Sequence, residues 1–311
     1  MARKLRVEYP GAIYHVMNRG DRREAIFLND ADREMFIATL AEAGQKTGWQ
    51  VQAFCLMGNH FHLVVETPQG NLVAGMKWLL GTYTARFNRR HKLFGHLFGG
   101  RYKTLIVDTS SSGYLRTVCE YVHLNPVRAK LLSPEQPLRT YRWSSYPVYL
   151  ERPERRPPWL RVERVLGELG IPKDSAAGRT EFERVMEERR HQDDPEEYGR
   201  IRRGWCLGEE AFRKELLAQV EERRGVSHYG AELQESATGK AERLVGEGLT
   251  KLGWTEADLA ERKKGDRAKL GLAMTLRAGT TMTLKWIAAR LRMGTGASLS
   301  NLLSARRRIR R

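Results

Sequence analysis

Residues 49–66 read WQVQAFCLMGNHFHLVVE and hold the pattern that decides the fold. Trp49–Met57 is rich in apolar and aromatic residues, as β-strands are, and Gly58-Asn59 after it is a turn signal. His60–Glu66 continues as a second strand, so the two strands form a predicted hairpin. Side chains alternate between the two faces of a strand, so both histidines of the second strand share one face.

The segments on either side of the hairpin continue an alternation of strands and helices. Strands are predicted from β-branched and aromatic residues, and helices from apolar residues at helical spacing. The expected elements are the strand 12–17, the helix 30–43, the helix 71–88, the strand 101–108 and the helix 114–123. This order predicts an α+β fold, a ferredoxin-like antiparallel sheet with helices packed on one face.

The composition changes at residue 151, where the charged, proline-rich stretch ERPERRPP begins. Such a stretch is typical of a linker. Only helices are predicted beyond it, at 160–169, 180–190, 209–223, 240–252 and 256–262. We therefore expect a sheet domain at 1–150, a linker with helices at 151–195 and an all-α domain at 196–311.

The C-terminal region has the pattern of a helix-turn-helix at 283–305. Ile287 and Leu291 would pack the first helix and Leu299 the second. In such a pair the outward residues of the second helix enter a DNA groove, although similar helix pairs occur in bundles that bind no DNA. The outward residues are Ser298, Ser300, Asn301 and Arg306.

The 311 residues include 54 Lys and Arg against 37 Asp and Glu, a formal net charge of +17. This balance favours a polyanionic partner, either nucleic acid or an acidic membrane surface. No apolar stretch has the length that a signal peptide or a membrane span needs, which favours nucleic acid. The three cysteines show no metal-ligand spacing and are typical of reduced thiols, so we expect a cytoplasmic protein.

The histidine pair His60 and His62 is the sharpest local feature. Two imidazoles side by side on one strand face can chelate a divalent metal, and a pair of surface histidines explains the pattern equally well. Imidazole prefers zinc-like metals, whereas magnesium and manganese prefer oxygen ligands. In phosphate chemistry a metal would polarise a phosphoryl oxygen and stabilise developing charge.

A second candidate lies on the helix that begins at Tyr114. Tyr121 and Asn125 are four residues apart, so they share a face if the helix reaches Asn125, where the following proline disfavours helical angles. A tyrosine hydroxyl, with an ordinary pKa of about 10, needs a metal or a base to become a nucleophile. The alternatives are a half-buried structural tyrosine and an asparagine that caps the helix end.

Basic and aromatic residues near these motifs are candidates for holding DNA. Cations would neutralise phosphates and aromatic rings would stack on unpaired bases. The rings are Phe98, Tyr102 and Trp143. The cations are Arg19, Arg22 and Arg23 after the first strand, Arg86, Arg89, Arg90 and Lys92 at the end of the helix 71–88, and Arg101 and Lys103 on the following strand. A solvated basic surface explains any single cation, and Trp143 is more typical of a core. His15 and His123 are interpreted as packed structural residues.

Together these motifs resemble the HUH-type single-tyrosine transposases, and among them the REP-associated tyrosine transposases. The resemblance rests on HFH (60–62) followed by YVHLNPVR (121–128), and on YHVMNRG (14–20), GGRYK (99–103) and YRWSSY (141–146). It covers residues 1–150. The C-terminal helices resemble the DnaA- or repressor-like extensions of longer members of this group.

The resemblance implies a ferredoxin-like catalytic domain that is a metal-dependent single-strand DNA endonuclease and strand transferase. His60, His62 and Asn125 would ligate Mg or Mn, although some relatives carry Gln in place of the asparagine. Tyr121 would attack a DNA phosphate, which leaves a 5′-phosphotyrosine link and a free 3′-OH. The implied partner is single-stranded DNA with a REP-like hairpin, and both a homodimer and a monomer are compatible with the sequence.

Two other functions stay open at this point. One is a non-catalytic, sequence-specific DNA-binding regulator derived from a transposase, in which the helix-turn-helix binds DNA. The other is a metal-dependent hydrolase of a nucleotide, in which Tyr121 only binds substrate. A protein–DNA adduct that resists denaturant distinguishes the transposase from both.

Overall fold

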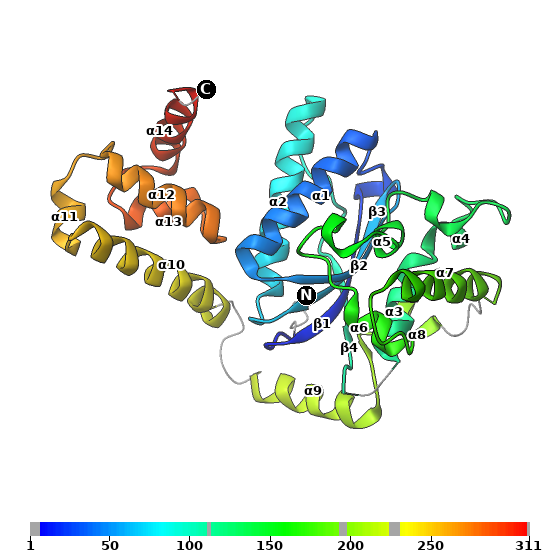
Figure 1. The fold of residues 1–311 in the computed structure, drawn as a ribbon. Helices are drawn as coiled ribbons and strands as arrows, with labels where there is room; N and C mark the ends of the chain where they lie inside the picture. Colours follow the sequence, from blue (N-terminus) through cyan, green and yellow to red (C-terminus); the bar gives the residue numbers. More distant parts are fainter. Residues whose placement is uncertain (1–6, 111–112, 193–197, 224–230, 310–311) are drawn as a thin grey trace. The chain divides into compact units, whose positions relative to one another are not determined.

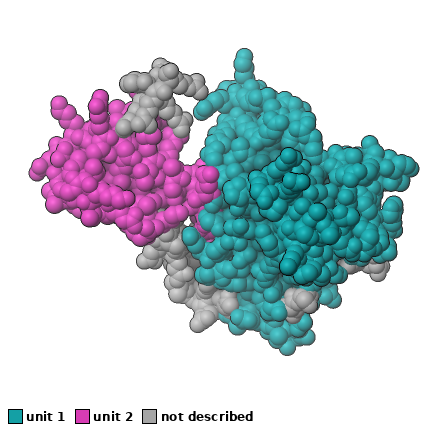
Figure 2. Space-filling model, in the orientation of Figure 1, with its two compact units in different colours: residues 1–44, 48–70, 79–228 teal, residues 45–47, 71–78, 229–311 magenta. Residues whose placement is uncertain are grey.

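The computed structural model describes residues 7–110, 113–192, 198–223 and 231–309 (Figure 1). The chain divides into two compact units (Figure 2). Unit 1 comprises residues 1–44, 48–70 and 79–228, and unit 2 comprises residues 45–47, 71–78 and 229–311. Residues 151–228 thus belong with the sheet in unit 1, and the division lies further along the chain than the boundaries near 150 and 195 that composition indicated.

Five strands form one sheet in the order β2-β3-β1-β4-β5. β1 (Ala12–Arg19) lies between β3 (His60–Thr67) and β4 (Lys103–Val107), and β2 (Gln50–Leu56) pairs with β3. These four strands are antiparallel, and with the two intervening helices they have the ferredoxin-like order. The predicted fold class is therefore confirmed.

α1 (Asp30–Thr47) and α2 (Leu72–His91) cover one face of the sheet. The ring of Phe36 in α1 packs against Phe61 of β3, with centroids 4.9 Å apart, and against Tyr83 of α2, with centroids 5.0 Å apart. All three rings are fully buried. The apolar side chains that alternate with the histidines along β3 point to this face, so the two histidines point to the other face.

A second helical layer covers that opposite face, to which the sequence pattern assigned no helix. α3 (Tyr114–His123) contacts β2 and β3 and is followed by the short α4 (Asn125–Arg128), and α5 (Ser145–Tyr149) contacts β2. The strand register sets the β3 histidines opposite Met17 and Arg19 of β1. Directly opposed residues share a face, so these four side chains all lie on the α3 side of the sheet.

The segment that follows residue 150 adds a helix to this layer and a strand to the sheet. α7 (Ala176–His191) packs through Phe182, whose ring stacks on Tyr149 with centroids 5.0 Å apart. β5 (Cys206–Leu207) pairs in parallel with β4, which corrects the prediction of only helices beyond residue 150, because two residues are too few to leave a periodic pattern. The remaining elements of unit 1 are η1 (Asp21–Arg23), η2 (Leu138–Thr140), η3 (Pro153–Arg155), α6 (Glu163–Glu168), α8 (Gly199–Arg203) and α9 (Glu210–Arg223).

In unit 2 the described residues 231–309 form helices and their connections. The helices are α10 (Ala231–Leu252), α11 (Glu256–Glu261), α12 (Arg267–Gly279), α13 (Leu284–Arg290) and α14 (Gly296–Ile309). Ile287, Leu291 and Leu299 are fully buried in the core of this unit, as the pattern of the helix pair predicts. Within the described residues, no helix is long and apolar enough to cross a membrane.

Candidate active site

His60 and His62 lie on β3 with their ring centroids 5.1 Å apart. His62 is 4% exposed, and His60 is partly exposed. The alternation of the strand brings both imidazoles to the face that α3 covers. His62 is therefore buried between the sheet and α3, whereas His60 is only partly covered.

His15 of β1 joins this pair. Its Nε2 lies 2.9 Å from Nδ1 of His62, and the two rings stack with centroids 5.1 Å apart and planes 10° from parallel. One of the two nitrogens must donate and the other accept. The interpretation of His15 as an ordinary packed histidine is thus incomplete. The motif around it gives no sign of the contact, because β1 and β3 become neighbours only in the folded sheet.

His60 has a partner in the hairpin turn. Its Nδ1 lies 2.8 Å from Oδ1 of Asn59, and Nδ2 of Asn59 donates to the carbonyl oxygen of Arg23 at 2.9 Å. The second bond orients the amide so that its oxygen faces the imidazole, and Nδ1 must therefore be the donor. Nε2 of His60 is left as the nitrogen with an available lone pair.

All three imidazoles are held neutral. Burial lowers the pKa of His15 to about 4, and burial together with the charge of Arg19 lowers the pKa of His60 to about 4. Burial, with smaller contributions from the neighbouring histidines, holds the pKa of His62 well below its ordinary value. Neutral imidazole is the form that ligates a metal, so the rings are in the competent state at neutral pH.

Tyr121 of α3 lies against these histidines. Its ring centroid is 5.8 Å from that of His62 and 5.7 Å from that of His15, both with edge-on geometry. The guanidinium carbon of Arg128 lies 4.7 Å from the Tyr121 centroid, and the same group donates to the Tyr121 carbonyl at 2.7 Å. The candidate nucleophile therefore meets histidines of its own chain.

Tyr198 adds a second aromatic ring beside Tyr121, with centroids 5.4 Å apart. The guanidinium carbon of Arg128 also lies 4.0 Å from the Tyr198 centroid. Tyr198 comes from the segment beyond residue 150, so that segment contributes to the surroundings of the candidate nucleophile. No motif marks Tyr198, because its position depends on how α7 and α8 pack.

Asn125 begins α4 directly after the end of α3. The chain stays nearly helical across the junction, since Leu124 N–H donates to the Glu120 carbonyl at 2.9 Å. Asn125 is 7% exposed, and its Nδ2 has no hydrogen-bond partner among the described residues. A buried amide with unused hydrogen-bonding capacity is compatible with a bound ligand or water nearby.

His60 and His62 could supply two neutral imidazole ligands to a divalent metal, and Asn125 is the candidate third ligand. Within the described ranges no three His, Cys, Asp or Glu side chains are grouped to hold a metal ion. Two neutral imidazoles and one amide supply at most three protein ligands, so substrate and water oxygens would complete the shell. Such a donor set suits a catalytic metal with open positions and not a closed structural one.

His123 lies away from the other histidines, in agreement with its interpretation as a packed structural residue. Its Nε2 is 2.8 Å from Oγ of Ser145, and the residue is 1% exposed. Its ring packs against Tyr149 with centroids 5.0 Å apart. This histidine holds α3 to α5 and gives a buried comparison residue for experiments on the site.

The predicted phosphate-binding residues of unit 1 lie at the surface. Arg19, Arg101 and Lys103 are exposed, and the register places Arg19 opposite His60. Two of the predicted stacking rings are buried, Tyr102 at 8% and Trp143 at 9% exposed, and Phe98, which packs on Phe61, is partly buried. In unit 2, Ser298 and Asn301 are exposed on α14, and the side chain of Arg306 lies outside the described residues.

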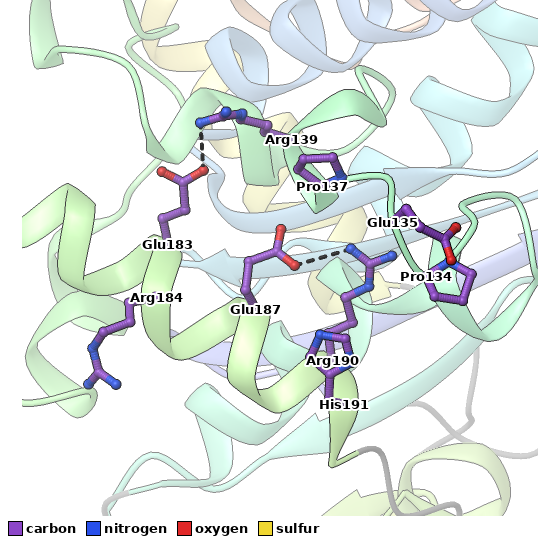
Figure 3. A pocket seen from close by; sticks show the side chains of 9 residues that line it. All are labelled: Pro134, Glu135, Pro137, Arg139, Glu183, Arg184, Glu187, Arg190 and His191. Atoms are coloured by element: carbon purple, nitrogen blue, oxygen red, sulfur yellow. Dashed lines mark hydrogen bonds and ion pairs between the residues drawn. The ribbon is translucent and has the colours of Figure 1, made fainter.

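A cavity of about 310 Å³ between η2 and α7 is a separate feature (Figure 3). Its lining contains three arginines and three glutamates, and two ion pairs, Arg139–Glu183 and Arg190–Glu187, lie within it. None of the candidate residues lines it. Balanced charge makes this cavity a poor site for a DNA phosphate.

Comparison with known proteins gives a family match for part of unit 1. Residues 8–125 match the model of the family described as "Transposase IS200 like", in line with the resemblance seen in the sequence. A solved structure described as "Structure of the REP associates tyrosine transposase bound to a REP hairpin" is 13% identical, with a TM-score of 0.41, and the match covers 49% of this chain and 87% of that chain. A search of curated proteins found no match.

Proposed function

We propose that this chain is a metal-dependent single-strand DNA endonuclease and strand transferase that acts through a 5′-phosphotyrosine intermediate. The observation that carries the proposal is a pair of neutral imidazoles, each with its Nδ1 hydrogen-bonded, beside the ring of Tyr121. The two Nε2 atoms are thereby left to bind a metal next to a candidate nucleophile. The match of residues 8–125 to the model of a transposase family supports this function.

His60 and His62 would hold Mg or Mn, with Asn125 as the third ligand. When bound, the metal polarises a phosphoryl oxygen of the DNA. The Tyr121 oxygen attacks the phosphorus and loses its proton, the bond from phosphorus to the 3′ oxygen breaks, and that oxygen leaves as a 3′-OH with a proton. Attack of a 3′-OH on the phosphotyrosine reverses these steps and joins two strands with no added energy source.

The proposal is tested with the full chain, Mn²⁺ and a single-stranded oligonucleotide that carries a hairpin. We expect a covalent adduct on a denaturing gel, and mass spectrometry of its digest should locate the nucleotide on Tyr121. Cleaved DNA with no adduct would indicate the hydrolase instead. Tight binding with neither cleavage nor adduct would indicate the non-catalytic regulator.

His15 has a positioning role in this proposal. If Nε2 of His62 binds the metal, Nδ1 must carry the proton, and only an acceptor at Nε2 of His15 fits the contact of 2.9 Å. Partners of this kind fix the tautomer and orientation of a ligating histidine, and their loss typically costs about 10–100-fold in metal affinity.

We therefore expect His15→Leu to weaken Mn²⁺ binding by about 10–100-fold in a calorimetric titration. His15→Gln keeps an acceptor and should recover part of the loss. Nitrogen-15 NMR of the histidine rings should show His62 protonated at Nδ1 in the parent protein and in His15→Gln, and a mixture of tautomers in His15→Leu. Parent-like Mn²⁺ affinity in a folded His15→Leu protein would remove this role.

Unit 2 is proposed to recognise duplex DNA, such as a hairpin stem, through α14. The favouring observation is that the apolar residues of the α13–α14 pair are buried while Ser298 and Asn301 are exposed on the second helix. This unit would select the DNA, and unit 1 would cut it. The same observation is the basis of the regulator hypothesis, in which only unit 2 acts.

Asn301→Ala should weaken binding to the hairpin substrate by about 5- to 150-fold, because one good contact to a base edge contributes about 1–3 kcal/mol. Adduct formation on an unstructured strand should be unchanged. Thr275→Ala, an exposed substitution on α12, is the matched control. Fluorescence anisotropy with both DNAs measures the difference, and equal losses on both would exclude a specific role for α14.

A further inference from the structure

The loop between α2 and β4 presents an aromatic side chain to solvent. Phe94 is 97% exposed and its neighbour Leu93 is 48% exposed. The other large hydrophobic side chains that the described residues expose are aliphatic or methionine, from 38% to 56% exposed. Single exposed apolar residues need no explanation, but a fully exposed ring next to a second apolar side chain is less usual.

The loop is held on both sides of this ring. Leu93 N–H donates to the Asn88 carbonyl at 2.9 Å, and Nδ2 of Asn88 donates to the Gly95 carbonyl at 3.0 Å. On the other side, the Phe98 ring packs on Phe61 with centroids 6.0 Å apart. The exposed ring is therefore presented by an anchored loop and is not part of a frayed end.

The loop lies at the end of the sheet where the histidine pair begins. Gly20 bridges to Phe98, and Gly99 N–H donates to the Arg19 carbonyl at 3.0 Å. Arg19 is the cross-strand partner of His60. Phe94 is four residues from Phe98, so their Cα atoms are at most about 14 Å apart. A short stretch of DNA at the candidate active site can thus reach the ring.

The segments next to the exposed ring carry a net positive charge. The segments that meet at this end of the sheet carry more exposed cations than carboxylates, and this favours a polyanion over a lipid surface or an apolar protein. The cations are Arg19, Arg22, Arg23, Arg89, Lys92 and Arg101, and the carboxylates are Asp21 and Glu24. An exposed aromatic ring among cations is the arrangement by which proteins hold single-stranded nucleic acid.

We propose that Phe94 stacks on one unpaired base of the DNA strand that enters the active site, while Arg89 and Lys92 neutralise the phosphates beside it. The inference rests on the proposed function and adds the place at which the single strand is held. It also offers a more exposed stacking surface than Phe98, which is partly buried, and than Tyr102 and Trp143, which are buried.

The test uses the full chain with Tyr121→Phe, so that DNA is bound and not cut, and a single-stranded oligonucleotide in fluorescence anisotropy at several salt concentrations. Phe94→Ala should weaken binding by about 5- to 150-fold, since stacking on one base contributes about 1–3 kcal/mol. The slope of affinity against salt should not change, because no cation is removed. Phe94→Trp should bind as the parent does, and its added emission should be quenched by DNA.

Controls separate stacking from other effects. Leu217→Ala removes an exposed side chain that is 44% exposed on α9 and should change nothing. Lys92→Ala should reduce the salt slope, unlike Phe94→Ala. A series of oligonucleotides carries one abasic position each, at successive places along the strand. At one place the missing base should weaken binding to the parent and leave binding to Phe94→Ala unchanged, as expected for two groups in direct contact.

Parent-like affinity of Phe94→Ala, or a changed salt slope, overturns the inference. The inference is also overturned if light scattering shows a dimer of the parent and a monomer of Phe94→Ala while the DNA affinity is unchanged. The loop would then join two copies of the chain. The proposed function fails separately: Phe94 can affect binding in a protein that forms no phosphotyrosine adduct, and an adduct can form in a protein whose binding ignores Phe94.

Discussion

Tyr121→Phe is expected to abolish the covalent protein–DNA adduct and to lower strand cleavage by at least about 10⁴-fold, the scale of loss when a nucleophile is removed. The substitution deletes only the attacking oxygen. The ring keeps its edge-on contacts with His62 and His15 and its place under Arg128. Melting temperature and DNA affinity should therefore stay near those of the parent, while the adduct band on a denaturing gel disappears.

Tyr146→Phe is the matched control, because the buried Tyr146 hydroxyl has no hydrogen-bond partner among the described residues and lies outside the site. It should leave the adduct intact. An adduct of normal yield in Tyr121→Phe would show that another residue is the nucleophile. Recovery of cleavage on mixing Tyr121→Phe with His62→Ala would show that the tyrosine serves the histidines of a partner copy.

His62→Ala has the second largest expected effect. It removes one imidazole of the proposed metal site and the acceptor–donor contact with His15. Because a metal ion contributes several kcal/mol to stabilising the charge in phosphoryl transfer, cleavage should fall on the order of 10²–10³-fold. Mn²⁺ titration should show the matching loss of affinity, and binding of single-stranded DNA, which depends on the surface cations, should persist.

His123→Ala provides the comparison, since it removes a histidine of similar burial that bonds to Ser145 and not to the site. Truncation of a buried histidine lowers folding stability in itself, and this loss should appear in both variants. Only His62→Ala should lose Mn²⁺ affinity. Full Mn²⁺ affinity and cleavage in a folded His62→Ala protein would end the proposal of a metal at this pair.

The candidate residues close together in sequence could be placed from the sequence. The alternation of β3 is a local property, so His60 and His62 share a face whatever surrounds them. The helix bounds of α3, Tyr114–His123, are those expected from its apolar spacing and the proline that follows. The order of strands and helices was sufficient for the ferredoxin-like fold, because few topologies satisfy it.

Other features of the fold could not be predicted from local sequence patterns. The helical layer on the α3 side, the strand β5 and the assignment of residues 151–228 to unit 1 depend on which apolar surfaces meet in the fold. The exposure of the aromatic rings before β4 depends on packing in the same way. Phe98 and Phe94 have equal hydrophobicity and lie four residues apart, and only packing on Phe61 and Tyr83 makes Phe98 partly buried while Phe94 stays exposed.

The sequence by itself determined the chemical groups of the candidate site and the fold class, since strand alternation and helix periodicity act over a few residues. Only the tertiary structure decided that His15 meets His62, that Asn59 orients His60 and that Tyr121 lies beside its own histidines. Those contacts join segments up to about a hundred residues apart, and hydrogen bonds and ring contacts form only between atoms that the packed sheet and helices bring within a few ångströms.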